Sequence, residues 1–222
     1  MDRVLEPELM DLPDEVDAYA RANFADVNRR FVERLLEVTA HVPEQADAHI
    51  RAIDLGCGPG DITLRLATAR EFWNVCGVDA STTMIDRARA ETRTRHLANL
   101  TFEVANIKEA HKLGTADVVC SNSMLHHLPD PMVMWQAVKR ILVKGGTLFI
   151  RDLARPETPQ VAQALVDLHA AGESKLLRDE FYRSFLAAFT VDEVKTQLRD
   201  AGLGHLSVRM SSDRHMDIYG QI

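Results

Sequence analysis

The segment Ala52–Ile62 reads AIDLGCGPGDI, and it decides the fold. An apolar run ends at Asp54, three glycines follow at Gly56, Gly58 and Gly60, and a helical pattern begins after them. Glycine permits positive φ and lets a ligand approach the backbone, and the start of a helix offers unpaired N–H groups. The segment therefore predicts a strand, a tight turn and a helix with a ligand site at the turn. A glycine triplet without further signals would fit an empty turn equally well.

A second carboxylate strengthens the ligand interpretation. Asp79 ends the next apolar run, in VCGVDAS. If the two strands are parallel neighbours, Asp54 and Asp79 meet the same crevice at the carboxyl edge of the sheet, where ligands of such folds bind. A carboxylate in the second position can accept both hydroxyls of a ribose. The G-x-G-x-G spacing is shorter than the G-x-G-x-x-G spacing of dinucleotide-binding turns, which disfavours a nicotinamide cofactor.

Short apolar runs alternate with helical patterns through the middle of the chain. Runs of this kind are typical of parallel strands buried on both faces. The expected strands are Ile50–Leu55, Trp73–Val78, Leu100–Val104, Ala116–Cys120 and Thr147–Asp152, and the helices between them are Asp61–Arg70, Ser81–Leu97 and Pro131–Leu142. Two final runs, His205–Met210 and Met216–Ile222, predict a hairpin. The sequence thus predicts an α/β fold whose mostly parallel, seven-stranded sheet ends in an antiparallel hairpin, with helices on both faces.

Length and composition allow one or two domains with a sizeable core, since 46% of the residues are hydrophobic, and the motif pattern narrows this to a single domain over residues 1–222. Four parts are expected within it. Residues 1–47 form an N-terminal helical cap, 48–155 a ligand-binding core, 156–189 a helical insertion over the substrate, and 190–222 the last helix and hairpin.

The charge and the cysteine content limit which partners and which cellular compartment are expected. Lys and Arg total 26 and Asp and Glu total 33, so the net charge of −7 disfavours a nucleic-acid partner. No apolar run approaches the ~20 residues of a membrane helix, and the acidic N-terminus does not read as a signal peptide. Cys57, Cys76 and Cys120 are too far apart for a zinc or iron–sulfur motif. We expect a cytoplasmic protein, a monomer or homodimer, without a metal and without membrane contact.

Taken in order, these motifs resemble those of class I S-adenosylmethionine (SAM)-dependent methyltransferases of the small, small-molecule type. The resemblance rests on the D-x-G-x-G-x-G turn, the acidic end of the second strand and the later H-H-L-P-D-P, and it covers about residues 48–155. It implies a Rossmann-like seven-stranded fold, SAM as cofactor, S-adenosylhomocysteine (SAH) as product, and a small-molecule acceptor at O, N, S or C. The reaction would be an in-line displacement that depends on alignment and exclusion of water.

The resemblance places the cofactor contacts at the ends of the strands. Gly56, Cys57 and Gly58 would lie against the methionine part of SAM, Asp54 would act on its amino group, and Asp79 would hold the ribose hydroxyls. The other implied cofactor contacts are Gly60, Ala80, Ser81, Met84, Asn106, Ile107, Ser121, Asn122 and, from a helix that covers the cofactor, Tyr19.

Asn106 departs from the family pattern. Members usually have an acidic residue after the third strand, near the adenine amino group, whereas this chain has Asn106 followed by Ile107. The amide carbonyl can still accept a hydrogen bond, so the contact is expected without its charge. Ile107 and Met84 would pack near the adenine and ribose, although apolar residues at these positions would belong to a core in any case.

His126 and His127, in SMLHHLPDP, are the candidate catalytic residues. A base is needed only for an acceptor that is a weak acid, and an imidazole with a pKa near ~6.5 can serve at neutral pH. Adjacent side chains point in different directions on a helix or a strand, so at most one histidine should face the site. A role in packing and loop shape is the alternative for both.

The acceptor is expected to meet Asn122, Arg151, Tyr182 and Arg183. Arg151 ends the fifth strand and could pair with an acceptor carboxylate or phosphate, or instead with a nearby acid. Tyr182 and Arg183 lie off a helical stripe of phenylalanines that predicts core packing, and this leaves them for the ligand. The stripe consists of Phe181, Phe185 and Phe189.

Two other functions stay open at this point. One is a module that binds SAM or SAH without catalysis, and the other is a nicotinamide-dependent oxidoreductase on a Rossmann-like sheet. A methyltransferase that acts on nucleic acid is disfavoured by the net charge of −7 and by SNSM, at residues 121–124, in place of an N-P-P-Y-type signature.

Overall fold

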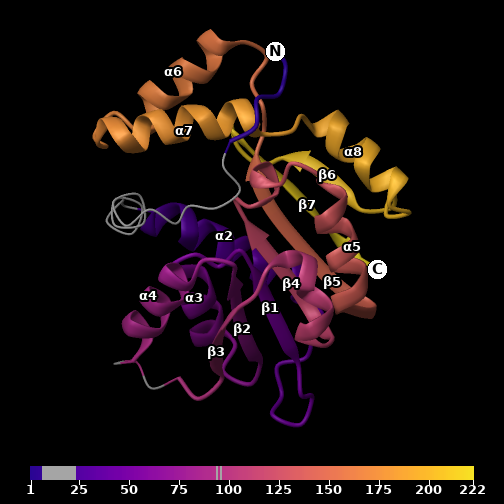
Figure 1. The fold of residues 1–222 in the computed structure, drawn as a ribbon. Helices are drawn as coiled ribbons and strands as arrows, with labels where there is room; N and C mark the ends of the chain where they lie inside the picture. Colours follow the sequence, from indigo (N-terminus) through magenta and orange to yellow (C-terminus); the bar gives the residue numbers. More distant parts are fainter. Residues whose placement is uncertain (7–23, 94, 96) are drawn as a thin grey trace.

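Seven strands form one sheet with helices on both sides in the computed structural model (Figure 1). The structure describes residues 1–6, 24–93, 95 and 97–222. The strand order is β3-β2-β1-β4-β5-β7-β6, in which the first five strands are parallel and β7 and β6 are antiparallel additions. This topology confirms the predicted α/β fold with its terminal hairpin.

The strands agree with the predicted runs, and two of them are longer. Their bounds are β1 Arg51–Leu55, β2 Asn74–Asp79, β3 Leu100–Val104, β4 Ala116–Asn122, β5 Leu142–Leu153, β6 Ser207–Met210 and β7 His215–Gln221. Strand β5 begins five residues before the predicted Thr147, because Leu142 already pairs with Ala116 before a register shift in the β4–β5 ladder. Gly145 and Gly146 interrupt the apolar pattern there and hide this extension from the sequence.

The helices also follow the expected pattern with trimmed ends. Their bounds are α2 Ala25–Val38, α3 Asp61–Ala69, α4 Thr82–Thr92, α5 Met132–Ile141, α6 Pro159–His169, α7 Lys175–Ala187 and α8 Val191–Asp200, with the 3₁₀ helices η1 Ile107–Leu113 and η2 Leu125–His127. Helix α4 stops five residues before the predicted Leu97. Helix α8 starts with a capping box between Thr190 and Glu193, as its sequence favours. No helix in the described ranges is both long and apolar enough to cross a membrane.

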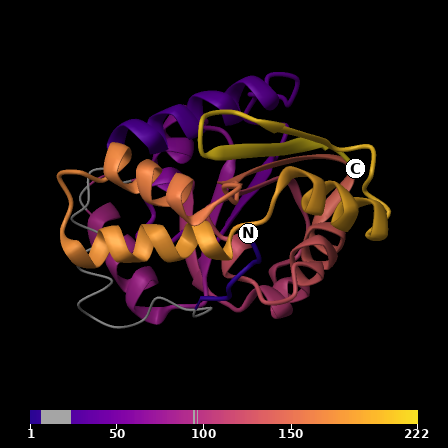
Figure 2. The ribbon, with the colours of Figure 1, turned by 90° about the horizontal axis from the view of Figure 1, so that it is seen from above.

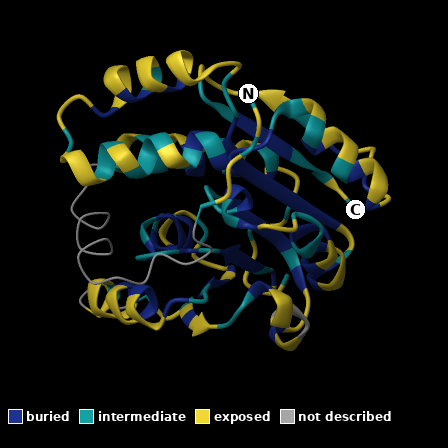
Figure 3. Cartoon of the chain, turned by 45° about the horizontal axis from the view of Figure 1, so that its top comes forward, coloured by how far each residue is buried: buried dark blue, intermediate teal, exposed yellow. Residues whose placement is uncertain are grey.

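Alternate residues of the strands build two cores. Ile53 and Ile150 face α5 and α8, whereas Ala52 and Phe149 face α2 and α3. On the second face Phe31 of α2 packs on Phe149, with ring centroids 4.9 Å apart. Figure 3 shows the strands buried between helices whose outer faces are exposed. Each core holds a helix layer against the sheet and thereby fixes the carboxyl ends of the strands relative to one another.

The helical insertion lies beyond the carboxyl ends of the central strands. Helices α6 and α7 form a layer there, and the first residues of the chain run beside α7 (Figures 1 and 2). The backbone N–H of Val4 donates to the carbonyl of Leu186 over 2.9 Å. The guanidinium of Arg3 lies 3.8 Å from the ring centre of Phe189. These contacts bring residues 1–6 to the end of the sheet at which parallel folds bind ligands.

Candidate active site

A cavity of about 310 Å³ lies at the carboxyl edge of the sheet. It is lined by residues at the ends of β1, β2 and β4 and by residues of η2, α7 and the β6–β7 turn. A second cavity of about 310 Å³ adjoins it at the glycine turn. The two share Phe24, Asn28, Gly56, Gly58 and Asn122 in their walls. The crevice expected between Asp54 and Asp79 is therefore present as a connected pair of cavities.

Two glycines of the turn have different surroundings: Gly58 borders open space, and Gly60 is closely packed. Gly58 has a φ of +52°, and a Cβ placed there would meet nothing within 4 Å, so its backbone borders open space. Gly60 has a φ of +85°, and its Cβ would lie 2.8 Å from the ring of Phe102 and 2.9 Å from the Cβ of Ala88. Gly58 is thus placed for ligand contact, whereas Gly60 is required for close packing.

Asp79 links the second strand to the glycine turn. Its Oδ2 accepts the N–H of Gly58 and its Oδ1 accepts the N–H of Ser81, each over 2.9 Å. Asp79, Ala80 and Met84 line the main cavity. Each carboxylate oxygen has more than one lone pair, so Asp79 can still accept hydroxyl groups of a ligand.

Asn106 and Ile107 form the neighbouring wall of the main cavity. The side chain of Asn106 also caps η1, because its Oδ1 accepts the N–H of Lys108 over 2.9 Å. One lone pair of the amide carbonyl therefore has a structural partner. A ligand donor would have to use the other lone pair, in line with the uncharged contact expected here.

Asp54 is completely buried and lines the second cavity. Burial raises its pKa to about 7, although the hydroxyl of Thr63 donates to its Oδ2 over 2.7 Å and favours the ionised form. A cationic ligand group beside this carboxyl would restore the charged form. The position therefore suits a positively charged amino group.

Asn122 carries an unsatisfied acceptor between the two cavities. Its buried Oδ1 accepts no hydrogen bond from the residues that the structure describes. A buried polar atom without a partner costs about 1–3 kcal/mol, so such an atom beside a cavity marks a place for a ligand donor. Asn122 lines both cavities.

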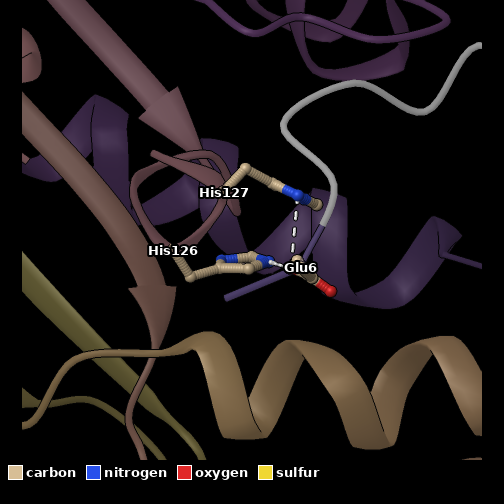
Figure 4. Close-up of side chains that lie close together, drawn as sticks. All are labelled: Glu6, His126 and His127. Carbon is tan, nitrogen blue, oxygen red and sulfur yellow. Dashed lines mark ion pairs between the residues drawn. The ribbon is translucent and has the colours of Figure 1, made fainter. Parts of the chain in front are cut away.

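The two histidines line the main cavity, and Glu6 lies beside both of them (Figure 4). Nδ1 of His126 lies 2.5 Å from Oδ1 of Asp152, and the backbone N–H of Leu125 donates to Oδ2 of Asp152 over 2.6 Å. Glu6 Oε1 lies 3.3 Å from Nε2 of His126 and 3.2 Å from Nδ1 of His127. Burial lowers the pKa of His126, but Asp152 and then Glu6 outweigh it, so the pKa stands above its ordinary value.

Both histidines line the cavity, which contradicts the expectation that at most one would face it. They belong to the short 3₁₀ turn η2, in which consecutive side chains are not spread as on a long helix or a strand. Their ring centroids lie 4.3 Å apart, with the planes tilted by 33°. The two imidazoles therefore act as one polar wall.

The family of methyltransferase domains matches residues 46–202 of this chain. The chain belongs to this family. The match covers the glycine turn, the acidic end of β2, the histidine pair and the whole helical insertion, and it confirms the resemblance drawn from the motifs.

Known relatives agree with this assignment. Trans-aconitate 2-methyltransferase of Methylobacterium nodulans is 30% identical over 205 residues, which are 86% of this chain and 76% of the relative. The 27-O-demethylrifamycin SV methyltransferase of Amycolatopsis mediterranei is 29% identical over 155 residues, 69% of this chain and 53% of the relative. Several of the curated relatives are thus matched over about half of their own length.

A solved structure shares the fold of this methyltransferase domain. The plantazolicin methyltransferase in complex with a monoazolic desmethylPZN analogue and SAH has a TM-score of 0.73 and 15% sequence identity. The alignment covers 94% of this chain and 90% of that one. The two proteins therefore have the same architecture over nearly the whole chain.

Arg151 of the methyltransferase domain does not reach the cavity, which contradicts the expected acceptor contact. It is buried, and its guanidinium donates to both carboxylate oxygens of Asp217 over 2.7 and 2.9 Å. Asp217 stands opposite Arg151 in the β5–β7 ladder. The pairing comes from an antiparallel strand far along the chain, so the sequence pointed only to closer acids as partners.

Tyr182 and Arg183 are also displaced from the cavity. The α7 residues that line it are Leu177, Glu180, Phe181 and Ser184, which are spaced as one face of a helix. Tyr182 packs instead against the small core under α6, and the exposed Arg183 pairs with Glu180 over 2.9 Å. The prediction erred because it assigned the phenylalanine stripe wholly to the core, whereas Phe181 is shared between core and cavity.

Four residues that were predicted to contact the cofactor make contacts within the protein. Ser81 caps α4, since its Oγ accepts the N–H of Met84 over 3.2 Å, and Ser121 donates to the carbonyl of Leu55 over 2.7 Å. The Cys57 thiol packs beside Phe102, and burial raises its pKa well above the ordinary value. These three residues and Gly60 do not line the main cavity, but Cys57 and Gly60 line the second cavity, so their predicted contact with the cofactor stays a prediction. Tyr19 lies outside the described residues.

Sequence reasoning missed two acids of the histidine wall. Asp152 is the last residue but one of β5, much as Asp79 is the last residue of β2, so an acidic residue near a strand end was an available signal. Glu6 has no such signal, because it meets the histidines only through the folding of residues 1–6 against α7. Arg214 and His169, which also line the main cavity, were not predicted either.

Proposed function

We propose that this protein transfers the methyl group of SAM to a small-molecule acceptor. One observation carries the proposal: a single cavity is lined by Asp79, by Asn122 with its unsatisfied Oδ1, and by the His126–His127 wall. Such a cavity can hold the methyl donor and the acceptor together. When bound, SAM supplies a sulfonium whose methyl carbon is electrophilic.

The residues at the strand ends fit SAM by their chemistry. Asp79 would accept the ribose hydroxyls, Gly58 would allow close backbone contact, and Asn122 would accept a donor of the methionine part. Asp54 would pair with the ammonium group across the second cavity. The Oδ1 of Asn122 accepts no hydrogen bond from the described residues, and the backbone of Gly58 borders open space, so these two positions support the assignment most directly.

At the acceptor end, His126 is proposed as the base for a hydroxyl or another weakly acidic acceptor. Asp152 holds Nδ1 of His126 and raises its pKa, so Nε2 is the nitrogen that takes the proton of the acceptor. His127 completes the wall and orients the acceptor. An acceptor that is already a good nucleophile would need only the alignment.

The walls of the acceptor end suit a small, partly apolar molecule with a polar group. Leu153, Leu177 and Phe181 supply apolar surface, Arg214 supplies positive charge, and His169 supplies a polar ring. The relatives named for trans-aconitate and demethylrifamycin SV support a small organic acceptor. Arg214 takes over the anion-binding role first expected of Arg151.

The function is tested by calorimetry and thermal unfolding with SAM, SAH and NAD, followed by a screen of SAM consumption. A ligand at about 100 times its Kd should add about 2.7 kcal/mol of stability. SAM and SAH should stabilise the protein and NAD should not. Stabilisation by NAD alone would favour the oxidoreductase. Binding of SAM without turnover across thiols, phenols, amines and carboxylates would favour a binding module.

We further propose that the protein works in the cytoplasm as a monomer or homodimer and without nucleic acid. The net charge of −7 supports the last point. Light scattering measures the oligomeric state, and a gel-shift assay with mixed-sequence DNA and RNA should show no complex at physiological salt.

A further inference from the structure

Glu6, His126 and His127 bring three potential metal-ligand atoms together (Figure 4). The atoms are Oε1 of Glu6, Nε2 of His126 and Nδ1 of His127, and all lie within 4.8 Å of one another. The two nitrogen–oxygen distances are 3.3 and 3.2 Å. Metal–ligand bonds of about 2.0–2.2 Å in a tetrahedral site separate neighbouring ligand atoms by about 3.3 Å. The spacing therefore suits a small cation between them.

The surroundings support the ligands as they do in metal sites. Nδ1 of His126 is held by Asp152, which leaves Nε2 for the cation, and such a carboxylate–histidine pair is usual behind a metal ligand. The second carboxylate oxygen of Glu6 accepts a hydrogen bond from Ser184 over 3.3 Å. Two of the three ligands are thus oriented by partners of their own.

A buried oxygen atom of Glu6 gives independent support for a ligand at this position. Its side chain is only 4% exposed, and its Oε1 accepts no hydrogen bond from the described part of the chain. This oxygen is directed at both imidazoles (Figure 4). A buried carboxylate oxygen in this position needs a positive partner, which is either protonated histidine or a cation.

The segment that carries Glu6 is anchored firmly. Arg3 donates to the carbonyls of His126 and Leu128 over 2.8 and 2.9 Å and to that of Ala187 over 2.6 Å. Val4 adds a backbone bond to Leu186. The anchoring ties residues 1–6 to the same turn that holds the histidines, so the three ligand atoms belong to one folded unit.

We propose that Glu6, His126 and His127 form a binding site for a divalent transition-metal cation, with Zn²⁺ as the best occupant. Two imidazoles and a carboxylate are the ligand set of several catalytic zinc sites, with the remaining position left to water or substrate. Mg²⁺ and Ca²⁺ prefer oxygen ligands and should bind poorly. We expected no metal because the spacing of the cysteines fits no metal motif. The present ligand set contains no cysteine, so that argument does not apply to it.

Occupancy of this site goes beyond the proposed methyl transfer and interferes with it. A cation on Nε2 of His126 uses the lone pair that would accept the proton of a hydroxyl acceptor. Zn²⁺ and that proton therefore compete for one nitrogen. Bound Zn²⁺ should slow any reaction in which His126 is the base, and a chelator should restore the rate.

The test uses the whole chain without an affinity tag, stripped with a chelator and titrated with ZnCl₂ by calorimetry. One Zn²⁺ per chain is expected, and Co²⁺ at the same site should give the visible absorption of a site with nitrogen and oxygen ligands. Glu6→Gln and His127→Ala should abolish stoichiometric binding. Asp152→Asn should weaken it by about 10–100-fold, as loss of a partner behind a metal ligand does.

His169→Gln is the matched control. His169 also pairs with a carboxylate, with its Nε2 2.6 Å from Oδ2 of Asp213, but it lies outside the cluster and should leave Zn²⁺ binding unchanged. Absence of Zn²⁺ uptake by the parent chain would mean that protons alone hold the cluster, and the proposal would be wrong. Equal uptake by the parent and Glu6→Gln would also overturn it.

Binding of SAH is measured on the same samples. Binding of SAH without binding of Zn²⁺ would overturn the metal site and leave the proposed methyl transfer standing. Binding of Zn²⁺ without SAH would do the reverse. Circular dichroism of each variant distinguishes a lost ligand from a lost fold.

Discussion

Oδ1 of Asp152 lies 2.5 Å from Nδ1 of His126, and this contact decides which nitrogen of the imidazole meets Glu6 and the cavity wall. The pair is buried and joins the end of β5 to η2. Because Asp152 raises the pKa of His126, it affects both the strength of the base and its orientation.

Asp152→Asn should lower kcat with a hydroxyl acceptor by about 10²–10⁴-fold, the usual contribution of a positioned base. It should also shift the acidic limb of the pH–rate profile to lower pH, because the pKa of His126 falls when the carboxylate is removed. Asp213→Asn, at the His169 pair on the rim, is the control and should leave that limb in place. An unchanged acidic limb in Asp152→Asn would contradict the role assigned to His126.

Asp79→Asn should weaken SAM binding at least ~10-fold, which corresponds to about 1.4 kcal/mol. The amide offers one acceptor atom where the carboxylate offers two, and it loses the charge that strengthens hydrogen bonds to hydroxyls. Calorimetry with SAM measures the change, and Asp86→Asn on the exposed face of α4 is the control. Equal affinity of the two variants for SAM would contradict the proposed contact between Asp79 and the ribose hydroxyls.

Substitutions at the glycine turn should separate binding from folding. Gly60→Ala forces a Cβ to within 2.8 Å of Phe102 and should lower the free energy of unfolding by more than the ~1–2 kcal/mol of left-handed strain. Gly58→Ala meets no neighbour and should cost only that strain, but it should weaken SAM binding. Urea unfolding and SAM calorimetry on both variants make the comparison. The interpretation fails if Gly58→Ala is the less stable of the two.

Asp54 should make the ligand-free protein less stable as pH rises. The pKa is about 7 in the folded protein and about 3.8 in the unfolded chain, so the folded state holds the extra proton between these values. Stability from this group is therefore complete below about pH 4 and is lost by about pH 7, at up to about 1.4 kcal/mol per pH unit. Urea unfolding at pH 5 and pH 7.5 should show a smaller difference for Asp54→Asn than for the parent. An equal difference in both proteins would argue against the raised pKa.

Arg151→Gln should destabilise the protein without changing the KM for the acceptor. It leaves Asp217 buried without its main partner, a change that costs about 3–5 kcal/mol. The loss should fall at the lower end because Nε of Arg34 lies 3.9 Å from Asp217. Denaturant unfolding measures the cost, and the double variant with Asp217→Asn should recover part of it. A raised KM for the acceptor at unchanged stability would show instead that Arg151 contacts the acceptor.

Patterns of neighbouring residues were enough to predict the part of the cavity wall that lies at the ends of the parallel strands. The strand, glycine turn and helix of Ala52–Ile62 and the acidic end of β2 are local patterns, and parallel topology brings their ends to one edge. Asp79, Asn106 and Asn122 could therefore be named as site residues and are found in the cavity wall. The histidine pair was recognisable for the same reason, since two ionisable residues lie in the short loop region that follows β4.

Only the tertiary structure assigned the partners of the charged groups. Arg151 meets Asp217 through an antiparallel ladder, and Glu6 meets the histidines through the path of residues 1–6 along α7. Backbone propensity and side-chain periodicity act over a few residues, whereas a buried charge takes whichever partner the folded chain brings within about 4 Å. The sequence thus determined the fold and the residues at the ends of the parallel strands. The packing of distant segments determined which carboxylates face the histidines and that Arg151 pairs with Asp217 instead of lining the cavity.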